Sequence, residues 1–259
     1  MKQLLMALLV SAVSSVAAAQ DSPLAWAARL ENSYRIVPNV TYLTASNWDA
    51  KLDLYVTRTP DKPLPTLIFI HGGGWTGGTK EGRDLAILPY LDMGMNVVNV
   101  EYRLARVAQA PAAVEDCRCA LRWVIQHAKE YGIDVNRLVV SGGSAGGHLA
   151  LTTGMVPASA GLDRRVSPLT YVRAGLPPVL TIHGDADPTV PYTQSVRLHK
   201  ALTDAGVANE LMTIPGGKHG FDCCTLAQRT SAYAKIREFL TRQRVLDAQK
   251  PPSTAQDRQ

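Results

Sequence analysis

Short apolar runs alternate with longer amphipathic segments over most of the chain. The apolar runs lie at 66–70, 96–100, 138–140 and 178–182, with a weaker fifth run at 210–214. Segments with helical periodicity lie near 83–92, 111–131, 145–154, 192–205 and 226–243. A run without polar alternation is typical of a strand buried on both faces. The pattern therefore predicts an α/β fold, with right-handed crossovers and helices on both faces of one mostly parallel sheet.

Two β-prone stretches precede this pattern and predict an antiparallel hairpin. They are Val40–Ala45 and Leu52–Thr57, on either side of the segment 47–49. Neither an internal repeat nor a linker divides the sequence that follows. We therefore predict one domain over residues 21–243, followed by a polar tail over 244–259.

The first twenty residues have the order of features found in a secretory signal peptide. Lys2 precedes an uncharged run to Gln20, with its apolar part at 4–13 and small residues at 17–19. A membrane anchor is the alternative, but the apolar part is shorter than the roughly 20 residues that a span needs. We expect cleavage near Gln20, a periplasmic or secreted protein, and no stable membrane insertion of its mature form.

Composition narrows the class of protein further. With 46% hydrophobic residues in 259, the chain can bury a sizeable core, which excludes disorder throughout. The net charge is +5, but the basic residues are scattered, so no nucleic-acid partner is predicted. The cysteine spacings match no common zinc site. In an exported protein we favour a disulfide that joins Cys117 or Cys119 to Cys223 or Cys224, with buried free thiols as the alternative.

The pattern G-x-S-x-G occurs at 142–146, directly after an apolar run and before a helical segment. This order suits a nucleophile on a tight strand-to-helix turn, where the flanking glycines let the chains approach closely. The Ser144 hydroxyl would then lie at the carboxyl end of the sheet, and the helix N-terminus would direct N–H groups toward developing negative charge.

A second glycine-rich segment, His71-Gly72-Gly73-Gly74-Trp75, also follows an apolar run. Together with the N–H of Ala145, the amides of Gly73 and Gly74 could form an oxyanion hole, in which each donor contributes roughly 3 kcal/mol to the transition state. A phosphate-binding loop is the alternative. The chain lacks both the G-K-[ST] ending of a P-loop and the glycine pattern of a dinucleotide site.

These two segments, HGGGW and GGSAGGHLA, resemble the α/β-hydrolase superfamily, in the branch of hormone-sensitive-lipase-like and feruloyl/acetyl-xylan-type carboxylesterases. Two later segments extend the resemblance. The segment 183–191, HGDADPTVP, is similar to the acid loop of the family, and 216–221, GGKHGF, is similar to its histidine loop. The resemblance covers about residues 40–240 and implies a catalytic domain with the α/β-hydrolase fold.

The resemblance also implies a role for each site residue. Ser144 would be the nucleophile, His219 the general base, and Asp187 the carboxylate that orients the imidazole. The order Ser, Asp, His along the chain is the order of this fold. Asp185 is the alternative acid, which we interpret as a loop-structuring residue, and Asp222 as a solvated or loop-capping carboxylate.

We interpret the remaining histidines as structural rather than catalytic. We expect His71 to bond backbone beneath the glycine loop, His148 to pack near the site, and His127 and His199 to be surface or boundary residues. No spacing suggests a metal site, and no cofactor is predicted. Trp75 could line the acyl or alcohol pocket, or it could be a core aromatic. The element 101–103, EYR, is interpreted as structural.

Little sequence is available for a lid. Only a short insert, 154–177, separates the nucleophile helix from the next strand. A minimal lid favours short-chain or aromatic acyl esters on a small-molecule or polysaccharide-linked alcohol over long-chain triglycerides. A prolyl-oligopeptidase-like peptidase and an aryl formamidase are alternative enzymes on the same fold. A binding protein on an inactive hydrolase fold is the non-enzymatic alternative, although it would typically have lost a triad residue.

Overall fold

The computed structural model describes residues 22–157, 166–220 and 224–248. The predicted signal peptide, the tail beyond 248, Asp222 and Cys223 lie outside these ranges. The elements in chain order are α1 (Pro23–Ser33), β1 (Tyr34–Ala45), β2 (Trp48–Thr57), β3 (Leu64–Ile70), η1 (Glu81–Arg83), α2 (Asp84–Asp92), β4 (Asn96–Val100), α3 (Ala112–Gln126), β5 (Ile133–Gly142), α4 (Ala145–Met155), η2 (Pro168–Tyr171), β6 (Val179–Gly184), α5 (Thr193–Asp204), β7 (Asn209–Ile214) and α6 (Leu226–Arg242).

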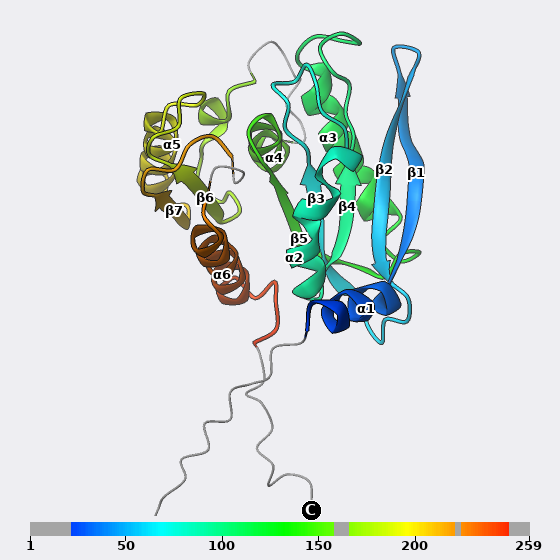
Figure 1. Cartoon of the computed structure of the whole chain (residues 1–259). Coiled ribbons are helices and arrows are strands. Elements are labelled where there is room, and N and C mark those ends of the chain that lie inside the picture. Colours follow the sequence, from blue (N-terminus) through cyan, green and yellow to red (C-terminus); the bar gives the residue numbers. More distant parts are fainter. Residues whose placement is uncertain (1–21, 158–165, 221–223, 249–259) are drawn as a thin grey trace, which may run out of the picture.

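Five strands form the main sheet in the order β1-β2-β4-β3-β5 (Figure 1). The hairpin β1–β2 is antiparallel, as predicted, and turns at Ser46 and Asn47, which both have a φ of 53°. Strand β2 pairs antiparallel with β4, whereas β3 runs parallel to both β4 and β5. At the centre, Ile68 of β3 lies opposite Val98 and Val140. The predicted mixture of an N-terminal hairpin and a parallel core is confirmed.

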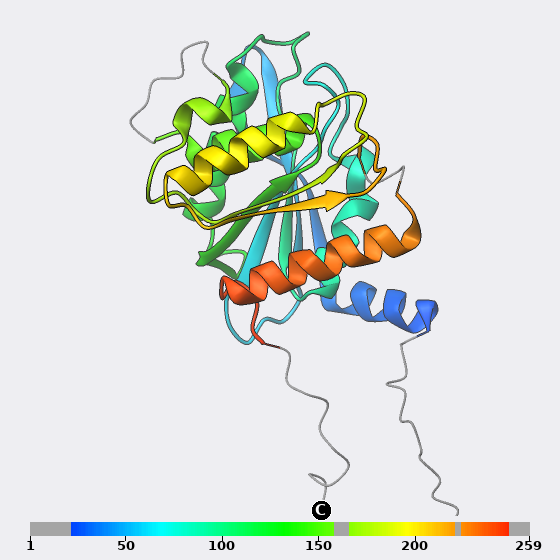
Figure 2. The same cartoon turned by 90° about the vertical axis from the view of Figure 1, so that its left-hand side faces the viewer.

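Strands β6 and β7 form a separate parallel pair. Figure 2 shows this pair between α5 and α6. In the part of the chain that the structure describes, no ladder joins β6 to β5, so the prediction of one continuous sheet is wrong in this detail. An apolar run identifies a strand but carries no information about which neighbour it pairs with, because pairing depends on backbone register between distant segments.

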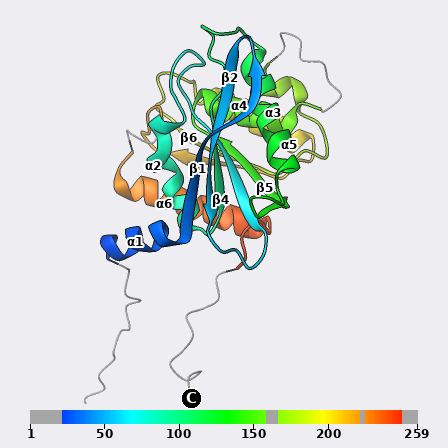
Figure 3. The same ribbon diagram turned by 90° about the vertical axis from the view of Figure 1, so that its right-hand side faces the viewer.

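Helices cover both faces of the main sheet (Figure 3). Alternate residues of β3 point to opposite faces, because the side-chain period of a strand is two. Ile68 packs in a core with residues of α3 and α4, such as Val124 and Leu149. Its neighbour Leu67 packs in a second core with α1, α2 and α6. The doubly wound arrangement predicted from the alternation of strands and helices is therefore confirmed.

Two features of the N-terminal region differ from the sequence-based expectation. Helix α1 was not predicted, although Pro23 begins it and the Ser22 hydroxyl accepts a hydrogen bond from the N–H of Ala25. Strand β1 begins at Tyr34 rather than Val40. As the edge strand it is half exposed and contains a proline, so its first residues lack the pattern of a buried strand.

The predicted disulfide between the two cysteine pairs is absent. Cys117 and Cys119 are both free thiols. Helix α3 places Cys117 in the core against the sheet, fully buried, where it behaves as a small apolar side chain. The Cys224 thiol lies beside the histidine loop instead and donates to the Gly220 carbonyl at 3.7 Å. Export permits disulfides, but it does not bring two cysteines within bonding distance.

Candidate active site

Ser144 lies on a sharp turn between β5 and α4. Its φ of 56° and ψ of −122° are rare for a residue with a side chain, and such strain persists only where the surroundings enforce it. The flanking glycines enforce it here by close packing. A Cβ atom at Gly146 would lie 2.1 Å from the carbonyl oxygen of Ile70, and one at Gly142 would lie 2.4 Å from the same atom. Strand β3 and helix α4 therefore approach each other only because both positions are glycine.

The three side chains proposed from sequence lie in one hydrogen-bonded chain. Nε2 of His219 lies 2.8 Å from Oγ of Ser144, and Nδ1 of His219 lies 2.7 Å from Oδ2 of Asp187. Asp187 follows β6 and His219 follows β7. Because these two strands are parallel, both loops lie at the same end of the β6–β7 pair, where His219 contacts Ser144 on the turn after β5. Since Nδ1 donates to the carboxylate, Nε2 of the neutral ring accepts the serine proton.

The Asp187 carboxyl is held in its ionised form. Its side chain is only 3% exposed, and burial alone would raise its pKa. The backbone N–H groups of Thr189 and Val190 donate to Oδ1 at 2.7 and 2.9 Å, however, and His219 donates to Oδ2. These bonds outweigh burial and lower the pKa of Asp187 to about 2.

Asp185 does not contact the histidine. Its Oδ1 instead accepts a hydrogen bond from the N–H of Gly216 at 2.7 Å, and the N–H of Ala186 donates to the Gly217 carbonyl at 3.0 Å. These bonds tie the loop after β6 to the loop after β7. The geometry therefore agrees with our interpretation of Asp185 as a loop-structuring residue.

The glycine loop after β3 lies against the serine turn. A Cβ atom at Gly72 would lie 3.3 Å from Cβ of Ser144. Gly73 and Gly74 have φ values of 121° and 60°, and the Gly73 carbonyl accepts the N–H of Gly77, which folds the loop back on itself. Within the described residues, the amides of Gly73, Gly74 and Ala145 donate no hydrogen bond. Three donors are thus available beside the serine hydroxyl.

His71 supports this loop from below, as predicted. It is 1% exposed, stacks on Tyr102 with ring centroids 4.4 Å apart, and donates from Nδ1 to the Gly72 carbonyl at 2.7 Å. Burial lowers its pKa, although the bond to Gly72 opposes that shift. The Tyr102 hydroxyl donates in turn to the His71 carbonyl at 3.2 Å. A neutral, fully packed ring of this kind fixes the backbone of the loop.

Trp75 is not a core residue, since 43% of it is exposed. Its ring meets His148 edge-on, with centroids 5.2 Å apart, and Nε2 of His148 donates to the Val166 carbonyl at 2.7 Å. Trp75, His148 and Val166 therefore form one cluster, which joins the glycine loop to helix α4 and to the insert that follows it. His148 lies near the site, as predicted.

His199 is buried, which contradicts the prediction of a surface or boundary residue. Its ring nitrogens bond to Oδ1 of Asn209 at 2.7 Å and to Oγ1 of Thr181 at 2.8 Å. These polar partners lie on the neighbouring strands, so the sequence of α5 alone could not reveal them. His127 is half-buried, stacked on Trp123, and fits its boundary interpretation.

Two residues near the site were assigned no role from sequence. His183 lies four residues before Asp187, and its Nε2 lies 3.3 Å from Oδ2 of that carboxylate. His183 lies at the end of an apolar run and just before Asp187, and this position in the sequence could have identified it as a candidate site residue. Lys80 follows the glycine loop and is buried against Asp53 of β2. No spacing in the sequence points to this second contact.

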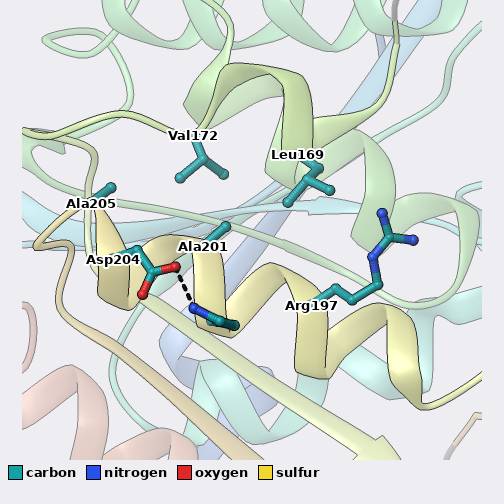
Figure 4. A pocket seen from close by; sticks show the side chains of 7 residues that line it. Leu169, Val172, Arg197, Ala201, Asp204 and Ala205 are labelled. Atoms are coloured by element: carbon teal, nitrogen blue, oxygen red, sulfur yellow. Dashed lines mark hydrogen bonds and ion pairs between the residues drawn. The ribbon is translucent and has the colours of Figure 1, made fainter.

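A separate groove of about 620 Å³ lies between η2 and α5 (Figure 4). Apolar side chains, including Leu169 and Val172, line one part, and Arg197 and the Lys200–Asp204 ion pair line the other. None of the predicted site residues lines it. Among residues 22–157, 166–220 and 224–248, no group of three acidic, histidine or cysteine side chains could hold a metal ion, and no helix is long and apolar enough to span a membrane.

Sequence comparison relates the chain to a family of hydrolases and to known esterases. The sequence model of the BD-FAE family matches residues 52–166 and 159–202. Esterase LipQ of Mycobacterium tuberculosis is 26% identical over 235 residues, which cover 70% of this chain and 56% of that protein. Carboxylesterase NlhH of the same organism is 41% identical over 88 residues, which cover 34% of this chain and 28% of that protein. The chain thus spans little more than half of LipQ.

Solved structures match a larger share of the chain than these relatives do. The propionate-bound form of esterase 2 from Thermogutta terrifontis superposes with a TM-score of 0.74 and 28% identity, covering 84% of this chain and 97% of that one. The same esterase phosphorylated by paraoxon also gives a TM-score of 0.74 at 28% identity, covering 84% and 96% of the two chains. The described fold is therefore that of an α/β-hydrolase.

Proposed function

The chain belongs to the BD-FAE family and has the α/β-hydrolase fold, and on that basis we propose that it is an exported serine carboxylesterase. The observation that carries the proposal is the contact chain from Ser144 through His219 to Asp187, beside three amides that donate no hydrogen bond to any described residue. Such a constellation is suited to acyl transfer through a covalent intermediate. The esterase relatives support the same activity.

In the first half-reaction, Oγ of Ser144 attacks the ester carbonyl carbon and its proton passes to Nε2 of His219. The carbonyl oxygen becomes negative and accepts hydrogen bonds from the amides of Gly73, Gly74 and Ala145. Asp187 stabilises the imidazolium through Nδ1. His219 then gives its proton to the leaving alcohol as the bond to the alkoxy oxygen breaks, and an acyl-serine remains.

In the second half-reaction, His219 takes a proton from water, and the hydroxide attacks the acyl carbon. The tetrahedral intermediate collapses, the bond to Ser144 breaks, and Oγ recovers its proton from the imidazolium. The products are a carboxylic acid and the free enzyme. No cofactor is needed in either half.

We further propose that the acyl group is short or aromatic, on a small-molecule or polysaccharide-linked alcohol. Propionate and butyrate are bound in structures of the Thermogutta esterase, which supports a small acyl group. Trp75 supports an aromatic one, because its exposed ring offers a flat apolar surface beside the glycine loop.

The test is the kcat/KM of the mature protein on p-nitrophenyl acetate, p-nitrophenyl octanoate and methyl ferulate, with Ser144→Ala as the blank. We expect Ser144-dependent turnover, with acetate or ferulate preferred. A preference for octanoate would reject the short or aromatic acyl group. If no ester is turned over, the esterase proposal fails, and assays on N-formylkynurenine and aminoacyl-Pro amides would test the formamidase and peptidase alternatives.

Export is a separate part of the proposal and has its own test. The signal-like order of residues 1–20 supports it. Expression of the full chain in a bacterial host should give a processed protein outside the cytoplasm, whose N-terminal sequence begins near Asp21. Recovery of the unprocessed chain in the cytoplasm or the membrane would reject it.

A further inference from the structure

His183 lies beside the carboxylate of Asp187 with each ring nitrogen near a polar atom. The residue occupies the end of β6, and its side chain is 11% exposed. Nε2 lies 3.1 Å from the carbonyl oxygen of Val190 and 3.3 Å from Oδ2 of Asp187. Nδ1 lies 2.7 Å from Oγ of Ser195 on α5. The mechanism proposed above uses none of these contacts.

The partners determine which nitrogen carries the proton. A carbonyl and a carboxylate both face Nε2, and both only accept hydrogen bonds, so Nε2 carries hydrogen. In the neutral ring, Nδ1 then accepts a hydrogen bond from the Ser195 hydroxyl. The rings of Tyr192 and His183 meet edge-on, with centroids 5.6 Å apart. The Tyr192 hydroxyl is hydrogen-bonded to Oγ1 of Thr213. The N–H of Nε2 thus donates to the Val190 carbonyl, and Oδ2 of Asp187 lies 3.3 Å from the same nitrogen.

The same nitrogen lies next to the carboxylate oxygen that binds the general base. Oδ1 of Asp187 is held by two backbone N–H groups, whereas Oδ2 receives Nδ1 of His219 at 2.7 Å and faces Nε2 of His183. Because His183 precedes the loop and also bonds Val190 near the end of it, one ring fixes both the loop and its carboxylate.

We infer that His183 is a positioning residue, which fixes the orientation of the Asp187 carboxylate so that Oδ2 stays in line with Nδ1 of His219. The inference rests on the proposed Ser144–His219–Asp187 triad. Small errors in such alignment are costly, since a displacement of about 1 Å can reduce a rate by about 100-fold.

His199 provides a matched control. It also has both ring nitrogens bonded, and one partner, Thr181, lies on β6 two residues before His183. Neither of its hydrogen bonds involves Asp187. Replacing either histidine with methionine removes two part-buried hydrogen bonds, so we expect both variants to lose stability, but only His183→Met to disturb Asp187.

The kinetic experiment compares His183→Met, His183→Gln and His199→Met. We expect His183→Met to lower kcat about 10- to 100-fold, with KM changed less than about twofold. His183→Gln should restore most of the rate, because its amide nitrogen reaches the position of Nε2. His199→Met should leave kcat nearly unchanged. Equal losses of kcat in the two methionine variants would overturn the inference.

A second comparison separates positioning from general packing. In an Asp187→Asn background, we expect His183→Met to have little further effect on kcat, because the two changes remove the same alignment. A loss as large as in the wild-type background would overturn the inference. If the wild type itself shows no Ser144-dependent turnover, it is the proposed function that fails.

One readout does not need activity. An N–H group close to a carboxylate favours its ionised form. Since His183→Met removes the N–H that lies 3.3 Å from Oδ2, an NMR titration should give a higher pKa for Asp187 in this variant than in the wild type or His199→Met. An unchanged pKa for Asp187 would overturn the inference even in a protein that turns over no ester.

Discussion

Nζ of Lys80 lies 2.9 Å from Oδ2 of Asp53, and the two side chains are only 2% and 7% exposed. Asp53 lies on β2, next to the central strand β4 of the main sheet, and Lys80 is the last residue before η1. The Lys80 carbonyl also accepts a hydrogen bond from Nδ2 of Asn99 on β4, at 2.8 Å. The glycine loop is thus tied to the sheet at its far end by a buried ion pair, as it is tied by His71 at its start.

We expect Lys80→Met to destabilise the protein by about 3–5 kcal/mol, because it leaves the Asp53 carboxylate buried without its cation. Urea unfolding followed by circular dichroism measures this loss. Lys200→Met is the matched control, since Lys200 pairs with Asp204 on the surface, where 74% and 62% of the two side chains are exposed. That variant should lose less than about 1 kcal/mol. Similar losses in both would contradict the assigned role of the buried pair.

The two aspartates of the loop after β6 should differ in their effect on rate. Asp187→Asn keeps the shape of the side chain but favours the wrong tautomer of His219, so we expect kcat to fall by about 10⁴-fold. The Asp185 carboxylate instead accepts a hydrogen bond from the backbone N–H of Gly216 in the neighbouring loop. Asp185→Asn should therefore lower kcat far less. A larger loss in Asp185→Asn would move the acid role to that residue.

Stability at low pH should report the ionised state of Asp187. Its pKa falls from 3.8 to about 2 on folding, because backbone N–H groups and His219 outweigh the effect of burial. The unfolded chain therefore binds a proton more readily than the folded chain. The stabilisation is complete above about pH 4 and is lost as the pH falls toward 2. Urea titrations at several pH values measure this effect. The difference in the free energy of unfolding between the wild type and Asp187→Asn should shrink as the pH falls from about 4 to about 2.

The sequence predicted those helices and strands whose pattern of apolar residues is complete within the element itself. Strand β4 has the bounds of its apolar run, Asn96–Val100, because all five residues are buried. Ser144 was predicted from the G-x-S-x-G pattern at the end of a predicted strand. Asp187 and His219 were predicted from the resemblance of the segments 183–191 and 216–221 to the acid and histidine loops of the family.

Features that depend on pairs of distant residues were not predictable. The missing ladder between β5 and β6 and the burial of His199 depend on side chains and registers contributed by other segments. Lys80 and Asp53 are separated by 27 residues, with no repeat or motif that relates them. Cys117 shows the same limit, because a thiol packed in the core cannot be told from a bridged one by spacing.

Alanine substitutions at two glycines of helix α4 should have opposite effects on stability. A Cβ atom at Gly146 would meet the Ile70 carbonyl oxygen at 2.1 Å, so Gly146→Ala must push β3 and α4 apart, at a cost of about 1–3 kcal/mol or more. At Gly154 no atom lies within 4 Å of the added methyl group, and alanine favours the helix by up to about 1 kcal/mol. Thermal unfolding of the two variants should shift in opposite directions. A neutral Gly146→Ala would show that the close approach is not required.

Trp75 should discriminate between acyl groups if its exposed ring contacts the substrate. Loss of an aromatic contact costs about 0.5–1.5 kcal/mol, so Trp75→Ala should lower kcat/KM for methyl ferulate about 2- to 12-fold relative to p-nitrophenyl acetate. Trp75→Phe, which keeps a ring beside His148, should restore most of the preference. The φ of 60° at this position strains alanine and phenylalanine alike, so strain does not distinguish the variants. Equal losses on both esters would mean that Trp75 supports the glycine loop and does not contact the acyl group.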